Sequence, residues 1–265
     1  MKKIGFIGAG NMGGALAATV AKSGNTVYLS DASPKKAEAL AKEISAVATT
    51  TEEIIKTCDM VFLGVKPQIL PAVASEIAPL VSARGDSVCL VSMAAGVTLE
   101  SLSGFFAGAK IIRIMPNTPA SVGAGVILYA LGEGANEVDE ALLVSALSFA
   151  GSLNKLDEKL IDAATAVSGC GPAFAYMFIE ALADGGVKCG LPRDKAQKFA
   201  AEMLLGAAKL CLESGKHPGE LKDAVCSPGG STIAGVAALE DGAFRASVMD
   251  AVEASYIRTK ELSGK

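Results

Sequence analysis

Short apolar runs alternate with helical patterns through the first half of the chain. Strands separated by helices of this length need right-handed crossovers, so the pattern predicts an α/β fold with a doubly wound parallel sheet covered on both faces. The predicted strands are Lys3–Ile7, Thr26–Ser30, Met60–Val65, Ser87–Ser92, Lys110–Met115 and Gly125–Ala130. The predicted helices are Asn11–Ser23, Pro34–Ile44, Thr51–Thr57 and Ile69–Leu80.

The pattern changes at about Leu156, after which long helical patterns follow one another. They cover Pro172–Lys188, Pro192–Ser214, Pro218–Val225 and Ser231–Leu262, and three of them begin with proline, which fits the first turn of a helix. We predict a second, all-helical domain over 156–265 after a first domain over 1–155. Its apolar patches exceed what a small bundle can bury, which favours packing against a second copy; a well-packed monomer core is the alternative.

A glycine-rich turn links the first strand to the first helix. Gly8 allows the turn, Gly10 allows a pyrophosphate to approach the backbone, and Gly13 allows the helix to pack against the sheet. The second strand ends at Asp31, where the ribose-binding acid of a Rossmann-type domain is expected. An ordinary strand-to-helix turn is the alternative, but the context favours a nucleotide.

Small or rigid residues follow three later strands, where a ligand of such a sheet would lie. Turn chemistry alone also selects glycine and proline, but three such loops in succession favour contact with a nicotinamide cofactor. The three loops are Gly64-Val65-Lys66-Pro67-Gln68, Ser92-Met93-Ala94-Ala95-Gly96 and Pro116-Asn117-Thr118-Pro119.

The helical half carries two further loops, Ser168–Ala173 and Cys226–Thr232, each before a helix. Backbone amides and hydroxyls at a helix start can bind a carboxylate, although an ordinary N-cap with flexible glycines explains each loop equally well. Two such loops in one small domain predict an anionic substrate held between them.

Composition narrows the function classes. The net charge is only −4, without runs of like charge, so nucleic acid and anionic membranes are not expected partners. The six cysteines are scattered and there is one histidine, so we expect no metal site. A strand starts at once and the apolar stretch 163–182 is interrupted by Ser168–Pro172 and Glu180, so we expect a cytoplasmic protein without a leader or membrane span.

Seven segments together resemble the pyrroline-5-carboxylate reductase family over nearly the whole chain. They are GFIGAGNMG (5–13), VKP (65–67), AAGVT (94–98), MPNTPA (115–120), SGCGPAFAY (168–176), DGGVKCGLPR (184–193) and HPGELKDAVCSPGGSTI (217–233). The resemblance implies hydride transfer from NADPH or NADH to the C=N carbon of 1-pyrroline-5-carboxylate, which gives L-proline in the last step of proline biosynthesis. It also implies a helical domain that interlocks with a partner subunit, with dimers that often assemble into decamers.

The resemblance also implies roles for individual residues. Thr232 would hydrogen-bond the ring nitrogen and is the candidate catalytic residue. The substrate carboxylate would be bound by Ser168, Gly169, Cys170 and Gly171 on one side and by Ser227, Gly230, Ser231 and Thr232 on the other. The cofactor would be bound by Gly8, Ala9, Gly10, Asn11, Met12, Gly13, Asp31, Ser33, Val65, Lys66, Pro67, Ala94, Ala95, Gly96, Asn117 and Pro119.

Two positions depart from the family pattern. Many relatives use NADPH and have an uncharged residue where Asp31 stands; a carboxylate there would bond the 2′-hydroxyl of NADH and repel a 2′-phosphate. Ser33, Lys35 and Lys36 follow in the sequence and could still bind the 2′-phosphate. Because of Asp31, our hypothesis is that NADH is used at least as well as NADPH. Cys170 stands where relatives usually have serine or another small residue, and a thiol is a weaker donor than a hydroxyl, so the resemblance implies that amides dominate carboxylate binding.

The chemistry needs no strong catalytic acid, because a protonated cyclic imine is already electrophilic and orientation contributes much of the rate. We interpret His217 as a surface or capping residue. One rival is a 3-hydroxyacid dehydrogenase of the 6-phosphogluconate type, which needs a lysine base that the segment 168–178 lacks. A nucleotide-sensing protein without catalysis is the second rival.

Overall fold

The computed structural model describes residues 1–262, whose contacts divide them into two compact units. The first contains residues 1–170 and 255–262, and the second contains residues 171–254. The sequence predicted the boundary after residue 155. The first unit extends further because helix α7 (Glu158–Ser168) packs against strand β7 (Gly125–Leu131).

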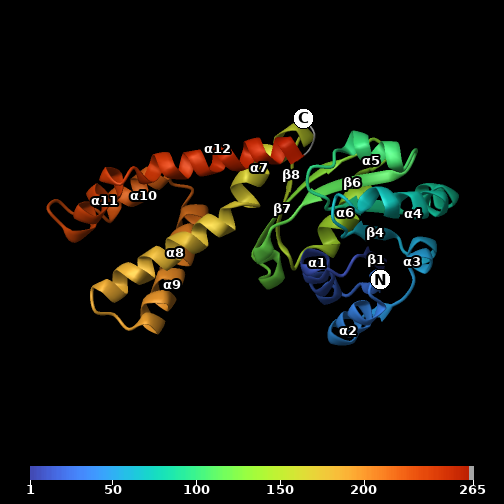
Figure 1. The fold of residues 1–265 in the computed structure, drawn as a ribbon, viewed down its shortest axis with the longest axis horizontal. Helices are drawn as coiled ribbons and strands as arrows, with labels where there is room; N and C mark the ends of the chain where they lie inside the picture. Colours follow the sequence, from blue (N-terminus) through green and yellow to red (C-terminus); the bar gives the residue numbers. More distant parts are fainter. Residues whose placement is uncertain (263–265) are drawn as a thin grey trace. The chain divides into compact units, whose positions relative to one another are not determined.

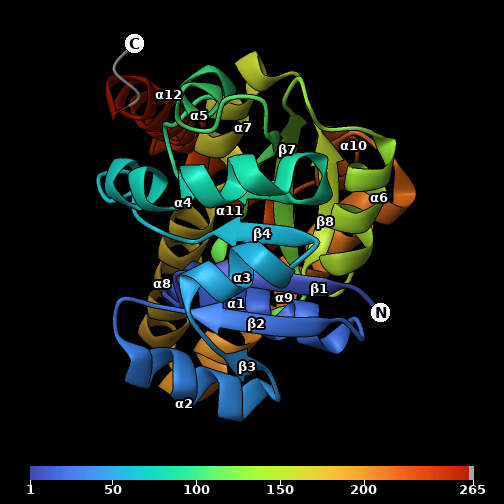
Figure 2. The same cartoon turned by 90° about the vertical axis from the view of Figure 1, so that its right-hand side faces the viewer.

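The first unit is built around an eight-stranded sheet in the order β3-β2-β1-β4-β5-β6-β7-β8. Figure 2 shows β3, β2, β1 and β4 side by side. The sheet order reverses between β1 and β4, which is the switch point where ligands bind in doubly wound folds. Its other strands are β1 (Lys3–Ile7), β2 (Thr26–Ser30), β3 (Val47–Ala48), β4 (Met60–Leu63), β5 (Cys89–Ser92), β6 (Lys110–Met115) and β8 (Gly151–Lys155).

The sheet is parallel except for one pair of strands. Strand β7 runs antiparallel to β6, which corrects the prediction of a wholly parallel sheet. The reason is the short connection: only the 3-10 turn η2 (Thr118–Val122) and its flanking residues join the two strands. A parallel neighbour needs a crossover of a dozen or more residues, so this link returns the chain antiparallel.

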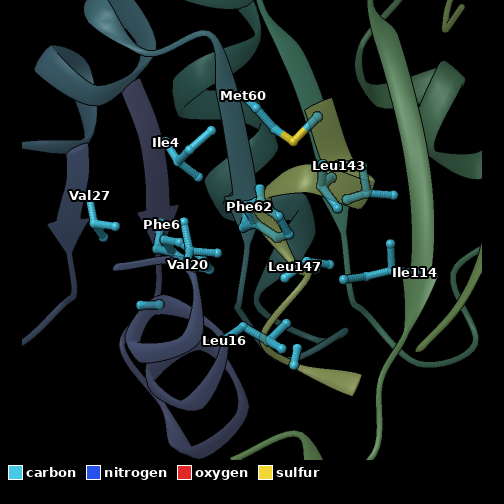
Figure 3. Close-up of a cluster of buried hydrophobic side chains, with 14 of the residues drawn as sticks. Ile4, Phe6, Leu16, Val20, Val27, Met60, Phe62, Ile114, Leu143 and Leu147 are labelled. Atoms are coloured by element: carbon cyan, nitrogen blue, oxygen red, sulfur yellow. The ribbon is translucent and has the colours of Figure 1, made fainter. Parts of the chain in front are cut away.

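Helices cover both faces of the sheet (Figure 1). Successive side chains of the strands point to opposite faces, and the apolar ones are buried in two hydrophobic clusters, one under the helices of each face. Phe6 and Phe62 stack with ring centroids 4.6 Å apart on one face, shown in Figure 3. On that face lie α1 (Asn11–Lys22), α2 (Pro34–Ile44) and α6 (Glu137–Ala146). On the other lie α3 (Thr51–Thr57), α4 (Leu70–Arg84) and α5 (Leu99–Phe105).

Several short elements were absent from the sequence prediction: β3, β8, α5, α6 and α7. The long helix predicted over Ser231–Leu262 is instead two helices, α11 (Ser231–Asp241) and α12 (Phe244–Leu262). The chain breaks between them at Gly242 and Ala243, where Ala243 has a φ of 54°. A left-handed alanine cannot continue an α-helix, so the apolar periodicity alone could not locate this break.

The second unit is helical and contains α8 (Gly171–Lys188), α9 (Arg193–Ser214), α10 (Pro218–Ala224), α11 and most of α12. Helices α8 and α9 pack on each other. Little of this unit is buried: its buried apolar residues are Ala183, Ala196 and Ala200, while Tyr176, Met177 and Leu205 are more than half exposed. The continuous segment Glu158–Lys188 is long and apolar enough to cross a membrane by length and composition alone, with 11% of its most apolar window buried.

Helix α7 is attached to the sheet by a buried ion-pair cluster. Arg113 on β6, only 1% exposed, contacts Glu158 through Nη1 at 2.9 Å and Asp162 through Nη2 at 3.0 Å. Glu158 also accepts a 2.6 Å hydrogen bond from the backbone of Leu99, at the start of α5. The cluster therefore fixes the first half of α7 to β6 and to α5.

We predict that Arg113→Met lowers the free energy of unfolding by about 3 kcal/mol, because it leaves neighbouring carboxylates without their cation. Urea unfolding at fixed protein concentration measures the change. The triple variant Arg113→Met, Glu158→Gln, Asp162→Asn serves as the control and should regain much of the loss. A single variant within about 1 kcal/mol of wild type would contradict the role of the cluster.

Candidate functional site

Three glycines bring the backbone together at the switch point of the sheet. A Cβ added at Gly13 would lie 2.2 Å from the carbonyl oxygen of Gly8, and one at Gly64 would lie 2.7 Å from that same oxygen. Gly8 has a φ of 104°, which an L side chain rarely adopts. The turn after β1, the start of α1 and the end of β4 are therefore in direct backbone contact.

Gly10 differs from these glycines because the protein itself does not require it. A Cβ at Gly10 would meet nothing within 4 Å, so this face of the turn is open. The first hydrogen bond within α1 joins the amide of Gly14 to the carbonyl of Gly10, so the amides of Asn11, Met12 and Gly13 precede it. Open space beside a helix N-terminus suits a pyrophosphate, which supports the fit of a dinucleotide.

Asp31 closes the other side of the glycine turn. Its Oδ2 accepts a 2.8 Å hydrogen bond from the amide of Ala9, and its Oδ1 accepts one of 3.0 Å from the amide of Ser33. The Ala9 amide thus points to Asp31, while the nearby Gly8 amide donates to the carbonyl of Ser30. The carboxylate is held in one position by the backbone of two segments.

A cavity of about 560 Å³ lies beside Asp31, at the carboxyl ends of β2 and β3. Its charged lining side chains are all acidic: Asp31, Glu38, Glu52 and Glu76. Thr49, Thr50 and Thr51 add hydroxyl groups. The side of the glycine turn where the sequence predicts the adenosine ribose is therefore hollow, polar and negatively charged.

The residues predicted to line the rest of the cofactor path follow β4, β5 and β6. Gly96 has a φ of 77° in the turn after β5, and Ala94 is buried while Ala95 is exposed. Lys66 and Ser33 are exposed, whereas Val65 and Pro67 are partly buried. Pro119 lies in η2, directly after β6. The structure thus gathers these predicted positions at one edge of the sheet.

Asn117 is the exception, because its side chain is 7% exposed and contacts the protein. Its Nδ2 donates to the carbonyl of Ser168 at 2.9 Å, and its Oδ1 accepts from the amide of Val126 at 2.9 Å. It links the end of β6 to the start of β7 and to the end of α7. Sequence reasoning had assigned this residue to the cofactor.

The predicted substrate loop at 168–171 forms the junction of α7 and α8. The amides of Gly169 and Cys170 both donate to the carbonyl of Thr165, and the hydroxyl of Ser168 donates to the carbonyl of Ala164. These donors are occupied in the last turn of α7. Gly171 begins α8 and Pro172 has no N–H, so the amides of Gly171 and Ala173 are the donors that this first turn offers an anion.

The second predicted loop precedes α11 within the helical unit. Gly230 is its N-cap, with its amide donating to the carbonyl of Ser227 at 3.0 Å. The first hydrogen bond inside the helix joins Ala234 to Gly230, so the amides of Ser231 and Thr232 precede it. Ser227, Ser231 and Thr232 are exposed, which leaves amides and hydroxyls available to a ligand.

The titratable groups outside these loops have structural roles. His217 caps α10, its Nδ1 accepting from the amide of Gly219 at 3.1 Å, as predicted. Burial raises the pKa of the Cys58 thiol to about 11 and that of Cys89 to about 12, so both stay protonated at neutral pH. Within residues 1–262 no group of three His, Cys, Asp or Glu side chains is placed to hold a metal ion.

Comparison with known proteins identifies the family. Residues 158–262 match the family described as pyrroline-5-carboxylate reductase dimerisation, and residues 3–96 match NADP oxidoreductase coenzyme F420-dependent. The pyrroline-5-carboxylate reductase of Arabidopsis thaliana is 44% identical over 98% of this chain and 95% of its own length. This chain belongs to the pyrroline-5-carboxylate reductase family.

Other family members agree with this assignment. Human pyrroline-5-carboxylate reductase 2 is 45% identical over 98% of this chain and 83% of its own length. The crystal structure of the Plasmodium falciparum reductase with NADP bound has a TM-score of 0.88 and 32% identity, covering 99% of this chain and 100% of that one. The fold and the dimerisation domain predicted from the sequence are thereby confirmed.

Sequence reasoning missed two residues of the site region. Gly64 was noticed only as part of a loop, although its position after a strand, opposite the glycine turn, is a signal for close backbone contact. Arg113 gave no signal, because a charged residue inside an apolar strand pattern does not reveal its partners. Glu158 and Asp162 are too distant in sequence to suggest the cluster.

We predict that two glycine substitutions in the same turn affect different properties, one the thermal stability and the other the binding of a dinucleotide. Gly13→Ala should lower the melting temperature by several degrees, because its Cβ would collide with the Gly8 carbonyl. Gly10→Ala should leave the melting temperature unchanged but weaken dinucleotide binding about tenfold or more, because its methyl group would fill the ligand's space. Thermal unfolding and cofactor fluorescence titration measure the two effects. Unchanged binding by Gly10→Ala would contradict the pyrophosphate position.

Proposed function

We propose that this chain reduces 1-pyrroline-5-carboxylate to L-proline with NADPH or NADH. The observation that carries the proposal is the near-complete correspondence with reductases of that name, at 44% identity over 98% of this chain for the Arabidopsis thaliana protein. The nucleotide-binding edge of the sheet supports it independently, because Gly10 leaves open space beside the start of α1.

The cofactor would be held by the first unit. The amides of Asn11, Met12 and Gly13 would bind the pyrophosphate, and Asp31 would bind the adenosine ribose. The loops after β4, β5 and β6 would line the path to the nicotinamide, through Val65, Lys66, Pro67, Ala94, Ala95, Gly96 and Pro119. When bound, the reduced nicotinamide supplies a hydride to the C=N carbon.

The substrate would be held by the two loops that open α8 and α11. Amides at Gly171, Ser231 and Thr232 would bind the carboxylate, and the hydroxyls of Ser227 and Ser231 would add further donors. The Thr232 hydroxyl would hydrogen-bond the ring nitrogen, which becomes an amine as the C=N carbon is reduced. The substrate carries its own activating proton, so these residues orient the ring and exclude water.

The proposal includes the assembly and the compartment. The dimerisation domain over 158–262 and its many exposed apolar side chains support a homodimer, with a decamer as the larger assembly. Covering the apolar segment Glu158–Lys188 with a second copy would bury it without a membrane. The six unpaired cysteines suit the reducing cytoplasm.

NADH should serve at least as well as NADPH. The Asp31 carboxylate is fixed by the Ala9 and Ser33 amides, and the neighbouring cavity has only acidic charged side chains. A 2′-phosphate there would meet negative charge, whereas a 2′-hydroxyl would find an acceptor. The exposed Lys35 and Lys36 lie on α2, outside that lining.

We predict that purified protein rapidly oxidises NADH or NADPH when 1-pyrroline-5-carboxylate is added. The loss of absorbance of the reduced cofactor measures the reaction. The control mixes oxidised cofactor with 3-hydroxy acids. Turnover only in the control reaction would reassign the chain to the hydroxyacid dehydrogenases. Absence of turnover in both would favour a nucleotide-sensing protein.

We predict that Asp31→Ser shifts the ratio of kcat/KM for NADPH over NADH upward by about tenfold or more, because it removes the repulsion of the 2′-phosphate and the partner of the 2′-hydroxyl. Glu52→Gln, at another acidic residue that lines the cavity, is the control for a general loss of negative charge. A ratio unchanged by Asp31→Ser would refute the role of Asp31 in cofactor choice.

A further inference from the structure

We infer that Asn117 is a positioning residue for the substrate, which it serves by fixing the junction of α7 and α8 to the cofactor edge of the sheet. The inference rests on the proposed function. It assigns Asn117 to the substrate side of the reaction, although it lies in a loop whose other members we assign to the cofactor.

The hydrogen bonds of Asn117 allow only one orientation of its amide. The Val126 amide is a donor and needs the side-chain oxygen, while the Ser168 carbonyl is an acceptor and needs the side-chain nitrogen. Exchanging the oxygen and nitrogen would oppose like groups on both sides. Asn117 thus forms a specific bridge between three segments: the end of β6, the start of β7 and the end of α7.

The bridge acts at the end of α7 that leads to the substrate loop. The other end is fixed by Arg113 through Glu158 and Asp162. The carbonyls in the last turn of a helix have no partner within it, and Asn117 satisfies the one at Ser168. The two ends of α7 are therefore tied to β6 by Arg113 and to the loop after β6 by Asn117, two residues that are four positions apart in sequence, and the second tie is the one beside the site.

Geometry connects this tie to substrate binding. Ser168 ends α7, Gly169 and Cys170 form the turn after it, and Gly171 begins α8. The amides of Gly169 and Cys170 donate to Thr165, which leaves the amides of Gly171 and Ala173 to bind an anion at this junction. Gly171 follows Ser168 by only three residues, so the bond from Asn117 to the Ser168 carbonyl would position the residue at which α8 begins.

Two substitutions separate positioning from cofactor contact. Asn117→Asp keeps an acceptor for the Val126 amide but places an acceptor opposite the Ser168 carbonyl. Asn117→Ala removes the hydrogen bonds to both Val126 and Ser168, and it is the variant to measure if Asn117→Asp does not fold. We expect the KM for 1-pyrroline-5-carboxylate and the inhibition constant of L-proline to rise about tenfold, while the dissociation constant of NADH stays within about twofold of wild type.

Tyr129→Phe is the matched control. It removes one hydrogen bond, from the Tyr129 hydroxyl to Glu140 at 2.7 Å, on the same strand as Val126. It should lower the melting temperature without changing the KM, so a general loosening of β7 is distinguished from loss of the bridge.

Each outcome decides the inference. Weaker NADH binding with an unchanged KM for the imine would make Asn117 a cofactor contact and overturn it. If the Asn117 variants lower the melting temperature and leave the KM unchanged, as expected for Tyr129→Phe, the role of Asn117 is merely structural and the inference is overturned. If the wild-type protein turns over the imine and both Asn117 variants have the wild-type KM, this inference alone is rejected. If the wild-type protein is inactive, the proposed function and the inference are rejected together.

Discussion

The contact between the backbones of Gly8, Gly13 and Gly64 is the constraint on which the nucleotide edge depends. A Cβ at Gly13 would lie 2.2 Å from the Gly8 carbonyl oxygen, so any side chain would push α1 away from the sheet. Because α1 begins at the switch point between β1 and β4, such a shift would move its free amides away from the proposed pyrophosphate position. Gly8, Gly13 and Gly64 are required for the close packing of the backbone in this turn. Gly10 is not required for packing, so the proposed binding of a ligand is the only role that would require it.

A second constraint joins the sheet to the part of the chain that follows it. Helix α7 is tied at its start to β6 by Arg113 and at its end to the loop after β6 by Asn117. A buried ion pair contributes little net stability compared with apolar packing, but its directionality fixes which groups meet. Strand β6 and the loop after it therefore fix both ends of α7.

The sequence predicted the features that depend on local pattern. The alternation of strand and helix patterns predicted the sheet, and Gly8 and Gly13 predicted the tight turn between β1 and α1, because each feature depends on neighbouring residues in the chain. The binding of a nucleotide at this turn stays a prediction. The antiparallel β7 was missed, since its direction follows from the length of the η2 connection rather than from its apolar residues. The break at Ala243 depends on one left-handed residue, and the partners of Arg113 and Asn117 depend on tertiary contacts; none of these leaves a periodic signal.

Asp31 shows how a structural role can prepare a functional one. Its carboxylate accepts hydrogen bonds from Ala9 and Ser33 before any ligand is bound, so its position requires no reorganisation when a ribose arrives. A carboxylate has lone pairs beyond those two bonds, so it can still accept from a 2′-hydroxyl. Removing it would loosen the glycine turn and change the charge of the adjacent cavity at once. Under the proposed role of Asp31, a substitution such as Asp31→Ser changes the charge of the cavity and the partner of the Ala9 amide together.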